Sequence, residues 1–312
     1  MKPAIDICVF GSVNADICVY ADKAAALGET RFGDHYALNL GGKGANQAIA
    51  AHRLGARVRL LGNVGDDVFG AFVLQELARF GLATDLIGAA RTHATGMASI
   101  LVDAAGRNAI TVISGANLAA RDAEFRTLAE ALTPSSALLL QCERAPSDNL
   151  RAAQIAKGIG ACIVLDPAPV PTDGSLSALA SLVDFVTPNE TETEMLTGIA
   201  PSEPAAVAKA ADALHRMGFR AVVLKLGARG AFASTPLLRQ NFAAPEVVCV
   251  DSVAAGDCFN AALAVQTCSG ADIGAAVQYA CSAGALCVSR QGAAASAPTA
   301  VELTAFVSAI SK

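Results

Sequence analysis

The feature that most constrains the fold is an alternation of short apolar runs with helical patterns along the chain. The near-continuous apolar character of these runs predicts strands that are covered on both faces, as in a parallel sheet. The clearest intervening helix lies between Asp67 and Gly81, with apolar residues along one face. This strand–helix alternation predicts an α/β protein with a doubly wound layer structure. The predicted strands cover residues 5–10, 58–61, 137–141, 162–165, 184–187 and 221–226.

Two segments depart from this alternation. Residues 14–40 contain strand-like runs and turns but no helical pattern, and residues 95–113 have the pattern of a hairpin with its turn at 103–106. Such inserted strands would either extend the edge of the central sheet or form a lid over the carboxyl ends of its strands, where ligands bind. No linker divides the chain, so we expect a single domain over residues 1–312.

Composition excludes several classes of protein. A hydrophobic fraction of 53% with 16% charged residues excludes intrinsic disorder, and a net charge of −5 argues against nucleic acid as a partner. No apolar stretch reaches the length of about 18 residues that a spanning helix needs, and the N-terminus lacks a signal-peptide pattern. The nine cysteines contain no CxxC pair, which predicts reduced thiols in a cytoplasmic protein and no zinc site. We therefore expect no membrane and no nucleic-acid partner.

The segment 251–260 combines an apolar lead-in, small residues and the beginning of a helix. Ala254, Ala255 and Gly256 let the backbone approach a ligand closely, and amides at a helix N-terminus favour an anion. Asp257 would then accept the proton of a hydroxyl that attacks a phosphoryl group. The alternative is an ordinary first-turn acid that complements the helix dipole.

A glycine-rich run at 41–46 also opens a helix, and its Lys43 and Asn46 offer hydrogen-bond donors to hydroxyls. The run is not a Walker A loop, which requires Ser or Thr after the Lys, and it is not the GxGxxG dinucleotide pattern. The alternative is a glycine turn with a solvated lysine.

Two pairs of polar residues follow predicted strands. Asn14 and Asp16 come directly after the first strand, where they would bind neighbouring sugar hydroxyls or form an Asx turn. Asn189 and Glu192 begin a helix and can face the same point. Glu192 would hold a water on Mg²⁺, or the pair would simply cap the helix.

These motifs, in this order, resemble those of the PfkB carbohydrate kinases over essentially the whole length. The run 41–48 is similar to the first motif of the family, and the run 251–259 is similar to the second. Within the family, the chain looks most like the members that phosphorylate ribose, because of the runs at 11–16, 28–30 and 188–192.

The resemblance implies both a fold and an activity. The implied fold is a ribokinase-like three-layer α/β structure with a central, mostly parallel sheet and a small β-sheet lid. The implied activity is ATP-dependent phosphorylation of D-ribose at O5, with Asp257 as general base and an anion hole formed by the amides of Ala254, Ala255 and Gly256. Mg²⁺ and an activating K⁺ are the implied cofactors, and the lid of family members often forms a homodimer interface.

The resemblance also implies a set of ligand-binding residues. The implied sugar contacts are Asn14, Asp16, Gly42, Lys43, Asn46 and Glu143. The implied ATP site contains Asn189, Lys225, Gly227 and Gly230, with Cys281 and Ser282 near the adenine and Glu192 near Mg²⁺. The implied K⁺ positions are Asp251, the carbonyls of Val253, Cys287 and Gly292, and Ser296. Ser252 and Cys258 depart from the commonest family residues without removing a group that the mechanism needs.

Three other functions are alternatives to a kinase for ribose: a kinase for another sugar or nucleoside, a non-catalytic regulator and a dehydrogenase. A kinase for 2-deoxyribose, fructose or pseudouridine would use the same chemistry, but Asn14 and Asp16 suit adjacent hydroxyls and so favour ribose. A non-catalytic sugar- or nucleotide-binding regulator would be expected to lack Asp257 or Gly256, and both are present. A dehydrogenase is disfavoured because no GxGxxG follows the first predicted strand.

Overall fold

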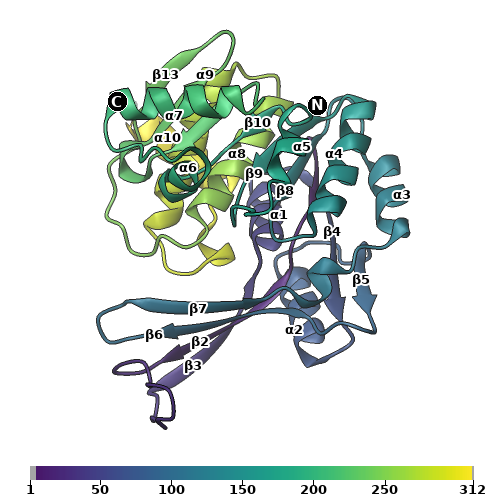
Figure 1. Cartoon of the computed structure of the whole chain (residues 1–312), viewed down its shortest axis with the longest axis vertical. Helices are drawn as coiled ribbons and strands as arrows, with labels where there is room; N and C mark the ends of the chain where they lie inside the picture. Colours follow the sequence, from purple (N-terminus) through teal and green to yellow (C-terminus); the bar gives the residue numbers. More distant parts are fainter. Residues whose placement is uncertain (1–4, 311–312) are drawn as a thin grey trace.

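A nine-stranded sheet runs through the molecule in the computed structural model, which describes residues 5–310 (Figure 1). Its strand order is β13-β12-β11-β10-β9-β8-β1-β4-β5. Neighbouring strands from β11 to β5 pair in parallel, and β12 and β13 add antiparallel strands at one edge. The strands are β1 (Asp6–Phe10), β4 (Arg57–Gly65), β5 (Ile87–Ala90), β8 (Ala137–Gln141), β9 (Cys162–Asp166), β10 (Phe185–Val186), β11 (Val222–Lys225), β12 (Ala231–Ser234) and β13 (Arg239–Phe242).

Every strand predicted from an apolar run is present in this sheet: the strand at 137–141 has the predicted ends, and the ends of the others are shifted. The strand predicted at 58–61 continues to Gly65 as β4, whereas the strand predicted at 184–187 is reduced to the two residues of β10. The sequence prediction missed β5, β12 and β13, because these edge strands are short and carry small or polar residues. The α/β class with a mostly parallel central sheet is confirmed.

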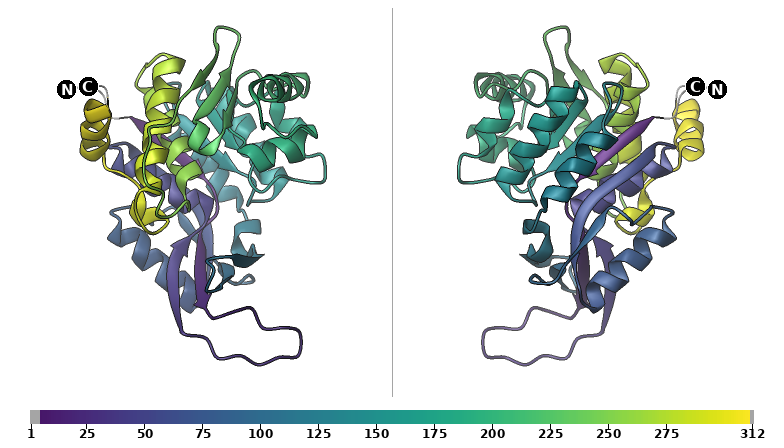
Figure 2. Two further views of the ribbon diagram at one scale, coloured as in Figure 1. Left: turned by 90° about the vertical axis from the view of Figure 1, so that its left-hand side faces the viewer. Right: turned by 90° about the vertical axis from the view of Figure 1, so that its right-hand side faces the viewer.

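Helices cover both faces of the large sheet, because successive strand residues point to opposite sides. Along β1, Ile7 and Val9 enter one apolar core, while Cys8 and Phe10 enter the other. Figure 2 shows the two helical layers on either side of the sheet. The first core is covered by α1 (Lys43–Arg53), α2 (Val68–Arg79), α8 (Ala255–Cys268), α9 (Ile273–Val288) and α10 (Ala300–Ile310). The second core is covered by α3 (Asp122–Ala131), α4 (Pro146–Ile159), α5 (Leu176–Ala180), α6 (Glu190–Thr197) and α7 (Pro204–Arg216).

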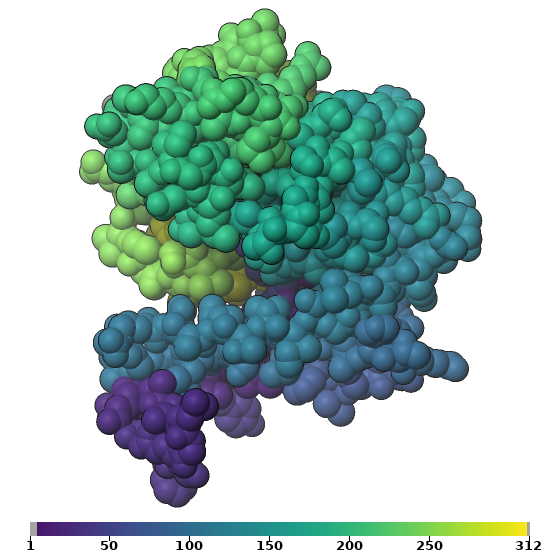
Figure 3. Space-filling view, in the orientation of Figure 1, coloured from purple at the N-terminus to yellow at the C-terminus, as the bar shows by residue number. Residues whose placement is uncertain are grey.

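The inserted strands form a separate four-stranded sheet in the order β3-β2-β6-β7 and do not extend the large one. β2 pairs with β6 in parallel, while the β2–β3 and β6–β7 pairs are antiparallel. Figure 3 shows this small sheet beneath the main body, with the loop between β2 and β3 hanging from its end. Its strands are β2 (Asn14–Tyr20), β3 (His35–Gly41), β6 (Gly96–Val102) and β7 (Asn108–Ile113).

Two further observations bear on the sequence expectations. All nine cysteines are free thiols. Across residues 5–310, none of the helices combines the length and the apolar character needed to cross a membrane.

Candidate active site

Asp257 lies in the first turn of α8 and is buried, with 5% of its surface exposed. Its Oδ1 accepts a hydrogen bond from Gln47 Nε2 at 3.0 Å, and its Oδ2 accepts one from Asn46 Nδ2 at 3.1 Å. Burial raises the pKa of Asp257 to about 6, against the opposing charge of Lys43. A carboxylate with this pKa is ionised at neutral pH and is suited to accept a proton from an alcohol.

The turn before α8 presents backbone amides at a helix N-terminus. Ala254 is the N-cap residue and has φ 62°, the one positive φ of a non-glycine residue between residues 5 and 310. Left-handed backbone costs an alanine about 1–2 kcal/mol, so the surrounding contacts must hold this turn in place. No side chain caps the helix. The amide of Ala255 makes only a long hydrogen bond, 3.4 Å, to the carbonyl oxygen of Ser252, so the turn can still present amides to an anion.

The glycine-rich run packs the beginning of α1 against the end of β1. Gly42 is the N-cap residue with φ 89°, and a Cβ at this position would lie 2.8 Å from the carbonyl oxygen of Ser12. Only glycine tolerates both the positive φ and this close approach. The turn brings Lys43 into a half-buried position, where burial lowers its pKa but the surrounding carboxylates raise it more. These carboxylates are Asp166, Asp257, Glu143 and Glu192.

A cavity of about 360 Å³ lies beside Lys43, with Asn14 and Glu143 among its lining residues. Asn14 Oδ1 accepts a hydrogen bond from Asn117 Nδ2 at 2.7 Å, which leaves the amide N–H groups of Asn14 for a ligand. Glu143 accepts hydrogen bonds from the Ser12 hydroxyl and, at 3.1 Å, from the backbone N–H of Lys43. The cavity therefore offers both donors and acceptors, as hydroxyl recognition requires.

Asp16 follows Asn14 on the same side of β2, because side chains alternate along a strand. Its carboxylate packs on Gly41, where a Cβ would lie 2.0 Å from Oδ2. Burial and the negative charge of Glu143 raise the pKa of Asp16 to about 7. Its Oδ1 is buried and has no hydrogen-bond partner among the described residues. An unpaired buried carboxylate oxygen is costly, so this atom is suited to receive a ligand hydroxyl.

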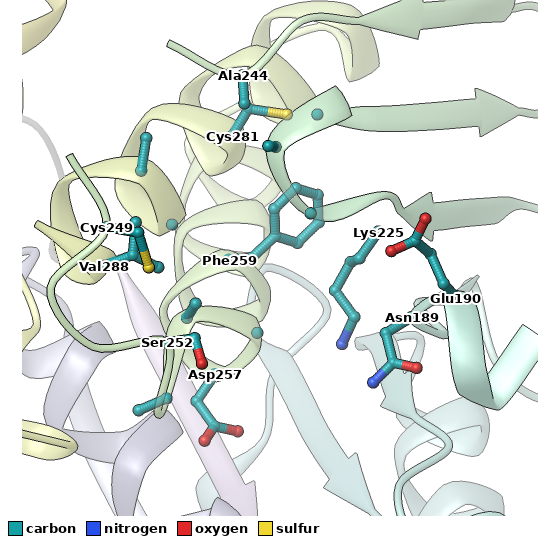
Figure 4. Close-up of a pocket in the computed structure, with 18 of the residues that line it drawn as sticks. Asn189, Glu190, Lys225, Ala244, Cys249, Ser252, Asp257, Phe259, Cys281 and Val288 are labelled. Atoms are coloured by element: carbon teal, nitrogen blue, oxygen red, sulfur yellow. The ribbon is translucent and has the colours of Figure 1, made fainter. Parts of the chain in front are cut away.

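A larger cavity of about 920 Å³ adjoins the N-terminus of α8. Figure 4 shows Lys225 and Asn189 on the wall opposite Asp257. Lys43 and Glu192 line both cavities, so the two cavities are neighbours. The predicted site residues in the larger lining are Lys43, Asn189, Glu192, Lys225, Gly227, Gly230, Ala254, Ala255, Gly256, Asp257 and Cys281.

Ser282 lies outside this lining, unlike the other residues predicted for the nucleotide. It is buried on α9, and its hydroxyl donates to the carbonyl oxygen of Gln278 at 3.1 Å. The hydroxyl thus satisfies the backbone of its own helix, a common use of Ser within helices.

Asn189 and Glu192 form a capping box at the start of α6. Asn189 Oδ1 accepts from the Glu192 N–H at 2.8 Å, and Glu192 accepts from the N–H and Nδ2 of Asn189 at 2.7 Å each. The capping alternative is therefore correct as a local description, although both residues also line the larger cavity. Burial raises the pKa of Glu192, against the nearby charge of Lys225.

The residues predicted for a monovalent cation lie together next to the turn that precedes α8. Asp251 accepts hydrogen bonds from the N–H of Val253 and of Gly292, both at 3.0 Å. The Cys287 thiol lies 3.8 Å from the Val253 carbonyl oxygen and 3.0 Å from the Ser296 hydroxyl. Two loops separated by α8 and α9 therefore meet at this point.

Three residues that the sequence analysis did not consider belong to the same region. Gln47 contacts Asp257, Asp166 forms an ion pair with Lys225 at 2.9 Å, and Asn117 orients Asn14. Asp166 carried a usable signal, since it directly follows a predicted apolar strand, as Asn14 and Asp16 follow the first one. Gln47 lies within the run 41–48 that resembles the first family motif, although only Gly42, Lys43 and Asn46 of that run were assigned a role. Asn117 lies in a short helical segment without any local sign of function.

Two neighbouring cavities of unequal size, with a buried carboxylate in the lining of the larger, suit transfer of a phosphoryl group between a large donor and a small alcohol. The fold and this arrangement define a kinase of small alcohols. The family is shown by sequence: residues 4–300 match the model of the pfkB family carbohydrate kinases, and the chain belongs to this family.

Individual proteins similar to this chain are named as sugar kinases, in agreement with the family. The chain is 36% identical to a ribokinase from Haemophilus influenzae over 299 residues, covering 96% of this chain and 97% of that protein. It is 31% identical to a deoxyribokinase from Salmonella typhi over 304 residues, covering 97% and 99%. The structure of Arabidopsis thaliana ribokinase complexed with ribose and ATP is similar with a TM-score of 0.87 and 29% identity, covering 98% and 99%.

Proposed function

We propose that the protein transfers the γ-phosphoryl group of ATP to O5 of D-ribose, which yields ribose 5-phosphate and ADP. The observation that carries the proposal is the buried Asp257, which lines the larger cavity and is hydrogen-bonded to Asn46 of the glycine-rich helix. The relatives support the choice of substrates, because the one from Haemophilus influenzae is a ribokinase and the Arabidopsis structure holds ribose and ATP.

The proposed reaction uses Asp257 as general base. Its carboxylate accepts the proton of the 5-hydroxyl while O5 attacks the γ-phosphorus, and the bond from that phosphorus to the bridging oxygen breaks to release ADP. The amides of Ala254, Ala255 and Gly256 then stabilise the charge on the transferring group, because they are fixed at the N-terminus of α8 before the reaction begins. Lys43 adds a positive charge where the two cavities meet.

Recognition of the sugar is assigned to the smaller cavity and its border. Asn14 presents N–H donors, and Asp16 and Asn46 each present a buried side-chain oxygen without a partner in the described part of the chain. Glu143 lies in the cavity lining, and Gly42 shapes the turn that carries Lys43. A sugar with adjacent hydroxyls would satisfy the unpaired acceptor oxygens.

We propose Mg²⁺ and K⁺ as cofactors. Between residues 5 and 310, no group of three or more His, Cys, Asp or Glu side chains is arranged to hold a metal. Mg²⁺ would therefore be held mainly by phosphate oxygens and waters, near Glu192, which fits its usual coordination. K⁺ fits the oxygen-rich meeting point of Asp251, Val253 and Ser296, with the carbonyls of Cys287 and Gly292 beside it.

Two further assignments concern the whole molecule. We propose that the small sheet acts as a lid and joins two copies of the chain, because its β7 strand exposes Ile110 and Val112 at 54% and 52%. The proposed compartment is the cytoplasm, where reducing conditions keep thiols free.

The decisive experiment is a panel of acceptors with ATP: D-ribose, 2-deoxy-D-ribose, D-fructose and pseudouridine. We expect the highest kcat/KM with D-ribose, and phosphorus NMR of the product should show a phosphate ester at O5. The second candidate, 2-deoxyribose, is favoured by the Salmonella relative, which is a deoxyribokinase. A higher kcat/KM with 2-deoxyribose would replace the first proposal by the second, and no turnover with any acceptor would favour a regulator.

A further inference from the structure

Gln47 occupies a central position between two buried carboxylates. It lies on α1 with 0% of its surface exposed. Its Nε2 donates to Asp257 Oδ1 at 3.0 Å and to Asp166 Oδ2 at 3.3 Å. Its Oε1 accepts from Gln141 Nε2 at 2.7 Å. The hydrogen bond from Gln141 fixes the amide orientation, so the N–H groups of Gln47 point to the carboxylates.

The chain of contacts continues beyond Asp166 to the wall of the larger cavity. Asp166 Oδ1 accepts from Lys225 Nζ at 2.9 Å, and this ion pair is nearly buried, with 11% and 2% of the side chains exposed. A Cβ on Gly256 would lie 3.2 Å from Lys225 Nζ, so the lysine passes close to the start of α8. Contacts through Gln47 therefore connect Asp257 with the lysine next to the anion-binding amides.

The charges around Asp257 set its pKa, and Gln47 contributes to that balance. Asp166 raises the pKa of Asp257 through like-charge repulsion, while Lys43 and the hydrogen bonds from Gln47 and Asn46 lower it. The negative charge of Asp257 also acts on two nearby thiols, Cys258 on α8 and Cys287 on α9, in the direction that raises their pKa. The amide of Gln47 is the one group that donates to both carboxylates among residues 5–310. Its loss would leave two neighbouring buried carboxylates with their repulsion less compensated.

We propose that Gln47 is the positioning residue of the reaction: it holds the Asp257 carboxylate ionised and oriented, and couples it through Asp166 to Lys225. This inference rests on the proposed function of Asp257 as base. It assigns to α1 a task beyond sugar binding, because the same helix that begins with the glycine-rich run carries the amide that supports the base. Gln47 itself need not touch either substrate.

The test compares Gln47→Met with Asn149→Leu in the full-length protein. Gln47→Met keeps the length of the side chain but removes both donors. We expect kcat to fall about 10- to 100-fold while the KM for ribose changes little, since hydrogen bonds to charged groups are among the stronger ones. The acid limb of the kcat–pH profile should move upward by about one pH unit, because the ionised form of Asp257 loses a donor.

Asn149→Leu is the matched control, since it removes a nearby buried amide that donates to the backbone carbonyl of Gln141 at 2.7 Å and to neither carboxylate. We expect its acid limb to stay close to that of the native protein. A packing role alone would lower kcat in both variants without moving either acid limb, and that result would overturn the proposal. Gln47→Leu, which also removes both donors without adding a charge, serves if the Met variant does not fold; it should move the acid limb in the same direction, and an unchanged limb would overturn the proposal equally.

Failure of this inference is distinguishable from failure of the proposed function. If the acceptor panel selects a sugar other than ribose, the pH comparison is made with that sugar and still tests Gln47. If Asp257→Asn retains native turnover, the role of the base is wrong, and the proposal for Gln47 falls with it.

Discussion

At the residue scale, the carboxylates of Asp257 and Asp16 both have pKa values raised towards neutrality, for the same main reason. Burial raises the pKa of Asp257 to about 6 and that of Asp16 to about 7. Lys43 opposes the shift at Asp257, whereas Glu143 adds to the shift at Asp16. Asp257 is thus ionised at neutral pH, while Asp16 is balanced between its two forms.

The first prediction concerns Asp257. A general base acts only when ionised, so kcat should rise as the pH increases through about 6. Asp257→Asn removes the base and should lower kcat by about 100- to 10,000-fold, because general-base catalysis contributes that much. Steady-state rates measure the loss, and calorimetry with ATP checks that the variant is folded. A variant that keeps more than about a tenth of native turnover would exclude this role.

The second prediction concerns Asp16. Ionised Asp16 presents an unpaired oxygen to hydroxyls, so ribose binding should weaken as the pH falls through about 7. Asp16→Asn should weaken ribose binding by about tenfold or more and flatten this pH dependence, because it removes a charged acceptor. Calorimetric titration with ribose at several pH values measures both effects, and ATP affinity is the control. An undiminished pH dependence in Asp16→Asn would assign the titration to another group.

At the element scale, the beginning of α8 depends on loops that are distant in sequence. Its N-cap Ala254 has φ 62° and no side-chain cap, so the turn must be held from outside. Asp251 supplies such support, because its two oxygens bind the N–H groups of Val253 and Gly292. The same oxygens would lie beside the proposed K⁺.

The third prediction therefore concerns the cation. K⁺ should raise kcat relative to a large organic cation at equal ionic strength, because bound K⁺ would hold the turn that carries the anion-binding amides. Asp251→Asn should abolish most of this stimulation. Asp272→Asn is the matched control, since Asp272 caps α9 through the N–H of Ala275. Equal rates in both cations would leave Asp251 with a purely capping role.

At the scale of the whole molecule, the register of the small sheet sorts its side chains into two faces. Val112 is paired with Ala98, and Ala98 with Asp16, so these residues share the face that bears the site. Ile110 lies two residues from Val112 on the same face and is 54% exposed. Exposed apolar side chains in a row favour contact with another surface, and a second copy of the chain is the partner that we propose.

The fourth prediction tests this partner. The native protein should sediment as a dimer, and Ile110→Lys should shift it to the monomer, because a charge would replace an apolar contact. Leu237→Lys is the control: Leu237 is 95% exposed, between β12 and β13 of the large sheet. A native monomer in sedimentation velocity, or dimers of both variants, would exclude the lid face as the interface.

The sequence by itself determined the class of fold and the motifs. Apolar runs such as 137–141 identify buried strands because their signal is local, and glycines such as Gly42 mark turns that other residues cannot adopt. The helix beginnings at Lys43 and Ala255 likewise follow from nearby residues. Local sequence patterns were therefore sufficient to predict the candidate base, the glycine-rich run and the order of strands and helices.

Only the tertiary structure decided which of these groups meet. Gln47 and Asp257 form a hydrogen bond across 210 positions of the sequence. Asp166, on a third element, accepts a second hydrogen bond from Gln47. The separate small sheet depends on the parallel pairing of β2 with β6. This pairing cannot be predicted from a local turn, because no tight turn connects the two strands. Parallel pairing and buried side-chain contacts are set by the packing of the whole chain, so no local pattern records them.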